Sequence, residues 1–334
     1  MSTEPSLQTP EAIMAFINHF QKSRIMLSAF ELDIFSLLDQ KPMPSDEIAE
    51  RLGLNPRATD RLMNAVCALG FMKKEAEIFS NTEVGSQLFV KGKPGYMAGL
   101  HHTNSLWETW STLTESVKAG TAVYERPTDI NERDPDWLDA FIGAMHYRGM
   151  KQADDMIFHV DLGNAKTMLD IGGGSGVFDM AFVRADDSRS ATVFDLPNVK
   201  PIAERFINEA HMSKRINVIS GDYNIDPLPQ SYDLILLSAV VHINSWQGNA
   251  ALIRKCASAL NPGGRIVILD HVMEPGRVLP PAGAFFTLNM LVGTKEGDTY
   301  TEAEMIDWFV LAGLTFQEKV STAIGNNFMI AAKN

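Results

Sequence analysis

One short stretch, TMLDIGGGSG at 167–176, constrains the fold of this chain more than any other. An apolar run ends in Asp170, four glycines follow closely, and the apolar pattern then resumes as VFDMAFV. This order is typical of a strand, a tight loop and a helix, because glycine allows the positive φ angles and close backbone approach that such a loop needs. The stretch therefore predicts an α/β unit with a ligand site where the strand ends.

An acid stands before the glycines, in the spacing D-x-G-x-G-x-G formed by Asp170, Gly172, Gly174 and Gly176. This differs from the dinucleotide motif G-x-G-x-x-G, because a carboxylate at that point repels a pyrophosphate and attracts an ammonium. The ligand that we infer is S-adenosylmethionine (SAM), whose methionyl end carries an amine and a carboxylate and whose centre is a sulfonium. The alternative is a tight turn that uses glycine for its geometry alone.

Two further apolar runs in the second half of the chain also end in acids. ATVFD ends in Asp195, which follows Asp170 at a spacing of roughly 20 to 25 residues, where an acid at the next strand tip reaches ribose hydroxyls. INVIS is followed by Gly221, Asp222 and Tyr223, a carboxylate for the adenine amine and an aromatic ring for its face. Three strands that end in acids at one sheet edge describe a nucleoside site.

The overall charge and the cysteine content narrow the class of protein. The chain has 334 residues, and its formal charge of −12 disfavours nucleic acid as the partner. Its length favours about two domains. The two cysteines, Cys67 and Cys256, give no disulfide framework and suit a reducing cytoplasm. The first residues lack a secretory signal and no apolar run approaches the roughly 18 residues of a membrane span, so we expect a cytoplasmic protein.

The first part of the chain carries the pattern of a small helical domain. Apolar residues recur at helical spacing over 11–40, DEIAERLG predicts a further short helix, and Asn55 and Pro56 supply the N-cap and first-turn proline of another. Mixed polar and apolar residues over 72–84 then predict a small β wing. We therefore assign 1–124 as a mainly helical winged-helix domain for packing and dimerisation.

Residues 125–160 are predicted to form a linker and a helix that lines the substrate pocket. Phe141, Met145 and Arg148 fall at i, i+4 and i+7 of the helical stretch that begins at Trp137, so they share one face. An arginine at this place needs an anionic partner, which is either an acid within the fold or a substrate carboxylate.

Residues 161–334 alternate strands with helices and close with two β-like runs. Strands are predicted at 232–237 and 265–270, and LTFQEKV and NFMIAAKN form a final hairpin. This order predicts an α/β fold, a doubly wound and mostly parallel sheet with a C-terminal antiparallel hairpin. Ligands of such a sheet bind at the carboxyl ends of its strands, where the acids named above lie.

A histidine follows the fourth strand of this domain, in SAVVHINSW. His242 lies beside the expected place of the sulfonium, and an imidazole with an unperturbed pKa of about 6.5 can take the proton of a hydroxyl that attacks the methyl carbon. Asp270 closes the neighbouring strand, where it can orient the imidazole and stabilise its protonated form. The alternative is a structural histidine, with methyl transfer driven by placement of the two reacting atoms.

From about residue 20 to its end, the chain resembles the caffeate and acetylserotonin type of O-methyltransferase, a group of class I SAM-dependent methyltransferases. The resemblance lies in LSAFELDIFSLL, IAERLGLNPRATDRLMNAVCALGF, LDIGGGSG, FDLPNV, GDY, and VVH followed by GGRIVILD. It implies a seven-stranded sheet, a small-molecule substrate and an intertwined homodimer. Together with the residue patterns above, it assigns His242 as the base with Asp270, a cofactor site of Asp170, Gly172, Gly174, Asp195, Leu196, Asp222, Tyr223 and Ser238, and a substrate site of Phe141, Met145, Arg148, Asn289 and Met290.

Two positions depart from the family pattern. Ile243 and Asn244 follow His242 where the plant enzymes have Asp-Trp, and Thr299 stands where they have a second acid, with Asp298 beside it. The support for a strong oxygen base is therefore partly missing. This keeps open a second chemistry, methylation of a thioether sulfur in a small anionic acid of the dimethylsulfoniopropionate pathway type, which needs no proton removed.

Other classes of function are disfavoured. The adjacent His101 and His102 point to different sides of a helix and make a poor metal pair, so we expect no metal. A regulator that senses SAM and reads DNA needs a basic recognition helix, whereas residues 46–61 carry mixed charge. We expect SAM as the cofactor and neither nucleic acid nor a membrane as a partner.

Overall fold

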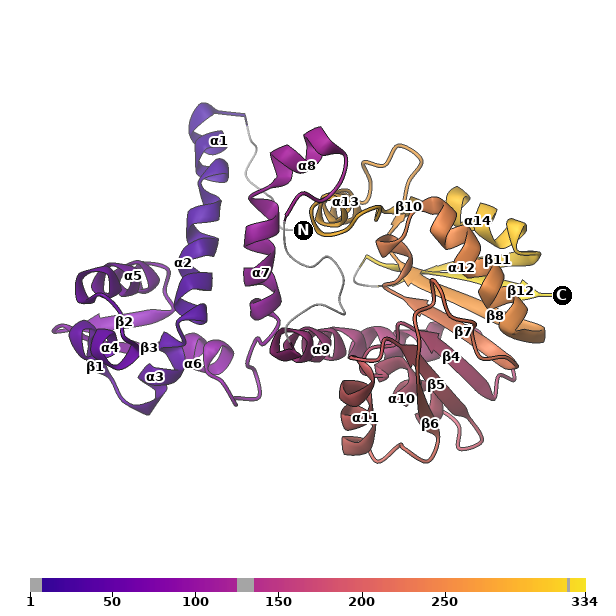
Figure 1. Cartoon of the computed structure of the whole chain (residues 1–334). Coiled ribbons are helices and arrows are strands. Elements are labelled where there is room, and N and C mark those ends of the chain that lie inside the picture. Colours follow the sequence, from indigo (N-terminus) through magenta and orange to yellow (C-terminus); the bar gives the residue numbers. More distant parts are fainter. Residues whose placement is uncertain (1–7, 125–134, 323–324) are drawn as a thin grey trace. The chain divides into compact units, whose positions relative to one another are not determined.

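The computed structural model describes residues 8–124, 135–322 and 325–334 of the chain (Figure 1). The first part of the predicted linker, 125–134, lies outside the described residues. Within the described ranges, no helix is long and apolar enough to cross a membrane.

The chain divides into two compact units, Met1–Asn104 and Ser105–Asn334. The first unit contains α1 (Pro10–Ile17), α2 (His19–Glu31), α3 (Ile34–Gln40), β1 (Met43–Pro44), α4 (Ser45–Leu52), α5 (Pro56–Ala68), β2 (Met72–Glu75), β3 (Ile78–Asn81) and α6 (Glu83–Phe89). The predicted cap of α5 is present, because the Asn55 side chain accepts a hydrogen bond of 3.1 Å from the Ala58 N–H. The three short strands pair in the order β1-β3-β2 and form the wing. The mainly helical winged-helix domain is therefore confirmed.

Helix α7 (Leu100–Trp110) runs across the division between the units. The second unit continues with α8 (Leu113–Ala119), α9 (Pro135–His159), β4 (Thr167–Ile171), α10 (Val177–Arg184), β5 (Ser190–Asp195), α11 (Lys200–Glu209), β6 (Ile216–Ser220), β7 (Tyr232–Ser238), α12 (Trp246–Ala259), β8 (Leu260–Asp270), β9 (Val272–Met273), α13 (Pro281–Gly293), β10 (Tyr300–Thr301), α14 (Glu302–Leu311), β11 (Leu314–Ser321) and β12 (Asn327–Lys333).

Seven strands of the second unit form one sheet in the order β11-β12-β8-β7-β4-β5-β6. The five strands from β8 to β6 are parallel, and β12 pairs antiparallel with both β8 and β11. The chain moves outward from β4 to β6 and then returns to β7 on the other side of β4. This reversal between β4 and β7 is the topological switch point, the place where open α/β sheets bind their ligands. The predicted sheet, with its antiparallel C-terminal hairpin, is confirmed.

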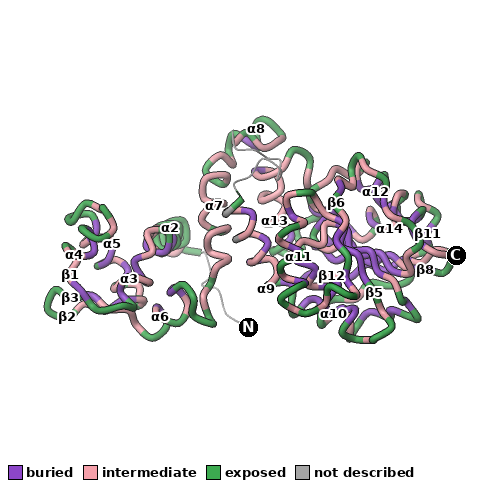
Figure 2. The backbone as a smooth tube through the Cα atoms, turned by 60° about the horizontal axis from the view of Figure 1, so that its bottom comes forward, coloured by how far each residue is buried: buried purple, intermediate pink, exposed green. Residues whose placement is uncertain are grey.

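Helices cover both faces of the sheet, with α10 and α11 on one side and α12 and α14 on the other (Figure 1). One core cluster joins the strands to buried residues of α9, α10 and α11, and a second joins them to α12 and α14. The central strands are buried along their length, as the purple tube in Figure 2 shows. A sheet held rigidly from both faces fixes the loops at the carboxyl ends of its strands, where the candidate site lies.

Candidate active site

The glycine loop after β4 turns sharply because three of its glycines have left-handed backbone angles. Gly172, Gly174 and Gly176 have φ values of 68°, 56° and 72°, which residues with a Cβ rarely adopt. A Cβ on Gly172 would also lie 2.9 Å from a methyl of Val240, which follows β7. The loop is therefore held close to the tip of β7. The N–H groups of Gly172, Gly174 and Gly176 donate to the Phe194 carbonyl, the Asp195 carboxylate and the Gly173 carbonyl, so internal hydrogen bonds fix the shape of the loop.

Asp195, at the tip of β5, joins the loop to the next strand. One of its carboxylate oxygens accepts the N–H of Gly174 at 2.8 Å, and the other accepts the N–H of Leu196 at 2.7 Å. Burial raises the pKa of this carboxyl, and the two N–H donors act in the opposite direction. Each oxygen still has a second lone pair, so the carboxylate can also accept hydrogen bonds from a pair of hydroxyls.

Asp170 lies beneath the glycine loop and is paired with a second acid, Asp179 of α10. Both side chains have no exposed surface, and within the described parts of the chain none of their four carboxylate oxygens has a hydrogen-bond donor. The two carboxyl groups are close enough for each to act on the pKa of the other. Burial, followed by the neighbouring carboxylate, raises the pKa of Asp170, and burial raises the pKa of Asp179 to about 7. Sequence reasoning missed Asp179, because it looks like an ordinary polar residue in the first turn of a mostly apolar helix.

The third strand tip supplies Asp222 and Tyr223, which follow β6. One Asp222 oxygen accepts the N–H of Asn224 at 2.8 Å. The Tyr223 hydroxyl donates to the side-chain oxygen of Asn244 at 3.1 Å, and burial raises the pKa of Tyr223 to about 12. The Tyr300 hydroxyl donates to the Asn244 carbonyl at 2.6 Å, so Asn244, where the plant enzymes have tryptophan, joins two elements of this edge.

His242 follows β7 in a short 3-10 turn, Val241–Ile243, and pairs with Asp270 at the end of β8. The imidazole Nδ1 lies 2.9 Å and 3.0 Å from the two oxygens of Asp270, and the two side chains are 12% and 2% exposed. Because an ionised carboxylate only accepts, Nδ1 carries the proton and the lone pair lies on Nε2. The tips of neighbouring parallel strands thus bring together two residues that stand 28 positions apart.

A phenylalanine ring contacts this histidine, and a second histidine ring contacts that phenylalanine. The Phe286 ring of α13 meets His242 edge to face at 4.8 Å, and the His271 ring lies 4.7 Å from Phe286. Burial lowers the pKa of His271, and the charge of Arg148 acts in the same direction. Arg148 therefore lies near enough to this edge for its charge to act on it. The sequence analysis missed Phe286 and His271, although the direct succession of Asp270 and His271 was a usable signal.

The predicted substrate residues lie on two helices of the second unit. On α9, Phe141 packs with Leu196 around a small buried cluster, Met145 is half-buried, and Arg148 is exposed without a salt bridge to any described residue. On α13, the side-chain oxygen of Asn289 accepts a hydrogen bond from the Trp110 indole, and Met290 is half-buried. Helix α13 also carries Phe286, whose ring contacts His242.

The segment before β10 supports the His242 backbone instead of its ring. The Asp298 N–H donates to the His242 carbonyl at 3.0 Å, and the Asp298 carboxylate forms an ion pair of 3.3 Å with Arg277. The hydroxyl of Thr299 bonds that of Thr287. Among the described residues, Asp270 is the hydrogen-bond partner that the structure gives to the imidazole.

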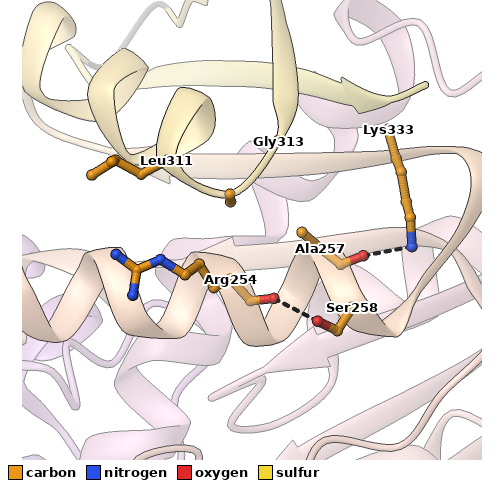
Figure 3. Close-up of a pocket in the computed structure, with 7 residues that line it drawn as sticks. Arg254, Ala257, Ser258, Leu311, Gly313 and Lys333 are labelled. Atoms are coloured by element: carbon orange, nitrogen blue, oxygen red, sulfur yellow. Dashed lines mark hydrogen bonds between the residues drawn. The ribbon is translucent and has the colours of Figure 1, made fainter.

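The cleft shown in Figure 3 belongs to the opposite edge of the sheet. It has a volume of about 370 Å³ and lies where α12 and α14 end. The Lys333 ammonium donates to the carbonyls of Ala257 and Leu260 at 2.7 Å and 2.6 Å, so it neutralises the end of α12. The length of β8 separates this cleft from His242, and it takes no part in the candidate site.

Three features of the carboxyl edge fit SAM. A buried acid lies beneath the glycine loop, Asp195 presents a carboxylate at the second strand tip, and the loop leads directly into the N-terminus of α10. The described residues include no group of three or more His, Cys, Asp or Glu side chains that could hold a metal ion.

Comparison with known proteins decides the family. A model of the O-methyltransferase domain matches residues 110–315, and a model of the O-methyltransferase dimerisation domain matches residues 14–91. The chain belongs to the O-methyltransferase family. It is a SAM-dependent methyltransferase. Relatives that align with almost the whole chain are named as O-methyltransferases.

Among these relatives, the tetracenomycin polyketide synthesis 8-O-methyl transferase TcmO of Streptomyces glaucescens is 29% identical over 94% of each chain. Acetylserotonin O-methyltransferase of Gallus gallus is 28% identical, also over 94% of each chain. The structure of PigF with SAH has a TM-score of 0.89, 22% identity, and covers 97% of this methyltransferase and 100% of PigF. Human N-acetylserotonin methyltransferase in complex with SAM has a TM-score of 0.82 and 24% identity, and covers 100% and 99%. The two structures support the fold.

Proposed function

We propose that the enzyme methylates a hydroxyl of a small aromatic molecule, with His242 as the general base. The observation that carries this proposal is the bonded pair of His242 and Asp270 at the switch point, one strand away from the glycine loop. When bound, SAM supplies an electrophilic methyl group on a sulfonium. The residues that would hold it are Asp170, Gly172, Gly174, Asp195, Leu196, Asp222, Tyr223 and Ser238.

The imidazole is prepared for proton transfer by its partner. Asp270 holds the proton on Nδ1, so the lone pair of Nε2 can accept the acceptor's hydroxyl proton as its oxygen forms the new bond to carbon. The imidazolium that results is stabilised by the carboxylate beside it. Phe286 fixes the ring edge to face, which keeps Nε2 directed at one place.

The surroundings favour a flat acceptor that carries a polar or anionic group. Phe286, Met145 and Met290 offer ring and thioether contacts, which suit an aromatic ring. Arg148 has no salt bridge within the described residues, and its charge acts on His271, so a carboxylate or phenolate of the acceptor is its expected partner. The relative TcmO, named for a polyketide, and the acetylserotonin enzymes support an aromatic hydroxyl.

The direct test incubates the purified protein with methyl-labelled SAM and a mixed panel of phenols, aromatic hydroxy acids and thioether acids. We expect a neutral methyl ether from a phenolic member of the panel, identified by mass and by charge. A heat-inactivated sample controls for chemical methylation. A permanently cationic sulfonium product would contradict the proposal and would recast His242 and Asp270 as positioning groups.

We also propose that the enzyme is a homodimer joined through its first helix, and the cysteine usage of the sequence favours a cytoplasmic location. No residue of α1 is buried, and Ile13, Met14, Phe16 and Ile17 are 42% to 58% exposed. A large exposed apolar surface on a helix needs a partner. A second copy is the occupant that we infer, because the dimerisation model of the family covers this helix from residue 14.

Substitutions in α1 test the proposed dimer. The double substitution Phe16→Asp and Ile17→Asp places charges on the exposed apolar face of α1, and we expect the mass in solution to fall from that of two chains to that of one. Light scattering after size-exclusion chromatography measures the mass. Val117→Asp, a change at a 61% exposed residue of α8, is the matched control. A dimer that survives the double change would exclude α1 as its interface.

A further inference from the structure

The buried acids Asp170 and Asp179 form a closed pair within the described part of the second unit. Neither side chain has exposed surface, and none of their four oxygens accepts a hydrogen bond from another described residue. A carboxylate only accepts hydrogen bonds, so the two groups can bond each other only if at least one of them carries a proton. Two like charges buried side by side would lose both hydration and hydrogen bonds, which is a cost that a shared proton removes.

The pair lies directly under the loop where the methionyl end of SAM is expected. Asp170 ends β4, Asp179 lies in the first turn of α10, and the glycine loop connects the two elements. A Cβ added to Gly173 would lie 2.8 Å from the Asp170 carboxyl, so the loop backbone rests on this side chain. A cation held above the loop therefore acts on the pair across one layer of backbone, in surroundings of low dielectric constant.

We propose that Asp179 is a positioning residue that shares its proton with Asp170, and that binding of the cofactor's α-ammonium group drives a proton out of the pair. This inference rests on the proposed function, because it takes the glycine loop as the place of the methionyl ammonium. The ammonium favours the ionised form of the pair, so cofactor affinity and proton loss are coupled. Affinity should rise as the pH rises.

The other titratable groups near the pair can be named. Asp195 of β5 acts on Asp170 through its charge. On α9, which packs against α10, the His146 ring bonds the Ser175 hydroxyl of the loop at 2.9 Å, and burial lowers its pKa. Glu209 of α11 acts on His146 in the opposite direction. A His146→Gln variant therefore serves as the control for titration near the pair that does not come from it.

The experiment measures binding of S-adenosylhomocysteine (SAH) by titration calorimetry between pH 6 and 8, in pairs of buffers with different ionisation enthalpies. We expect the wild-type enzyme to release a fraction of a proton, about 0.3 or more, and its affinity to rise by about 3- to 10-fold over this range. Asp179→Asn keeps the shape and a donor for Asp170 but has no proton to lose. Its proton release should vanish and its affinity should change by less than about twofold, whereas His146→Gln should behave as the wild type.

Titration of SAH itself is the same for every variant and cancels in the comparison. SAH binding with no proton exchange in the wild type, or unchanged release in Asp179→Asn, would overturn the inference. Because the wild-type measurement needs no substitution, an absence of proton release there would overturn the inference even if Asp179→Asn folds poorly. No SAH binding at any pH would instead overturn the proposed function, and this inference with it, so the two failures are distinguishable.

Discussion

His242→Ala should lower kcat for hydroxyl methylation by about 10²- to 10⁴-fold, the usual contribution of a positioned general base. The loss should fall on the chemical step, because the hydrogen bonds that the described residues give to the His242 ring go to Asp270 and not to the glycine loop. SAH affinity should therefore stay within about twofold of the wild-type value. Steady-state kinetics with the acceptor found in the labelled-SAM assay measures the first quantity, and calorimetry measures the second.

The pH profile separates a base from a structural histidine. In His242→Ala, kcat should climb with pH up to the pKa of the acceptor hydroxyl, because an acceptor that ionises by itself no longer needs the base.

The variant Asp270→Asn tests the other member of the His242–Asp270 pair. The new amide can accept or donate at Nδ1, and donation would move the imidazole proton to Nε2 and remove the base, so a loss of similar size is expected.

His159→Ala is the matched control, because this histidine is exposed in the last turn of α9. It should leave kcat unchanged. If His242→Ala retained kcat within about threefold on a neutral hydroxyl acceptor, the role of general base would be excluded. Placement of the two reacting atoms would then carry the rate enhancement.

The second large effect is expected from Asp195→Ala, which should raise the Kd of SAH by about 10- to 100-fold. The carboxylate holds the N–H groups of Gly174 and Leu196, so its loss frees the loop as well as the proposed contacts to ribose. Hydrogen bonds to a charged group contribute about 1.5 to 3 kcal/mol each, and about 1.4 kcal/mol corresponds to a tenfold change in affinity. Titration calorimetry with SAH measures the change.

Two further variants define the cause of that loss. Asp195→Asn keeps one acceptor oxygen and should lose about tenfold or less. Asp187→Asn changes a fully exposed acid after α10 and should leave the Kd unchanged. If Asp195→Ala bound SAH as tightly as the wild type, the second strand tip would not form part of the cofactor site.

The local elements of this protein could be predicted because their signals lie close together in the sequence. The closely spaced glycines predicted the tight loop, because only glycine adopts positive φ angles easily. Asn55 and Pro56 predicted the start of α5. Apolar runs that end in acids predicted the strand tips. The alternation of strands and helices then fixed a doubly wound sheet, because right-handed crossovers leave few other arrangements.

Other features depend on contacts between segments that are far apart in the chain. Asp179 looks like an ordinary polar residue of a helix until α10 packs over β4 and buries it beside Asp170. Likewise, no local sequence pattern predicts that Phe286 of α13 contacts the imidazole, or that the segment before β10 supports the His242 backbone.

The family, the sheet and the acids at its carboxyl edge followed from the order of residues, because they depend on short-range patterns and on a topology with few alternatives. The surroundings of each acid were set by tertiary packing. It gave Asp195 two backbone donors, Asp270 an imidazole, and Asp170 a second carboxyl group. The reason is physical: the protonation and role of a charged group depend on burial and on neighbours within a few ångströms, which packing supplies and residue order does not reveal.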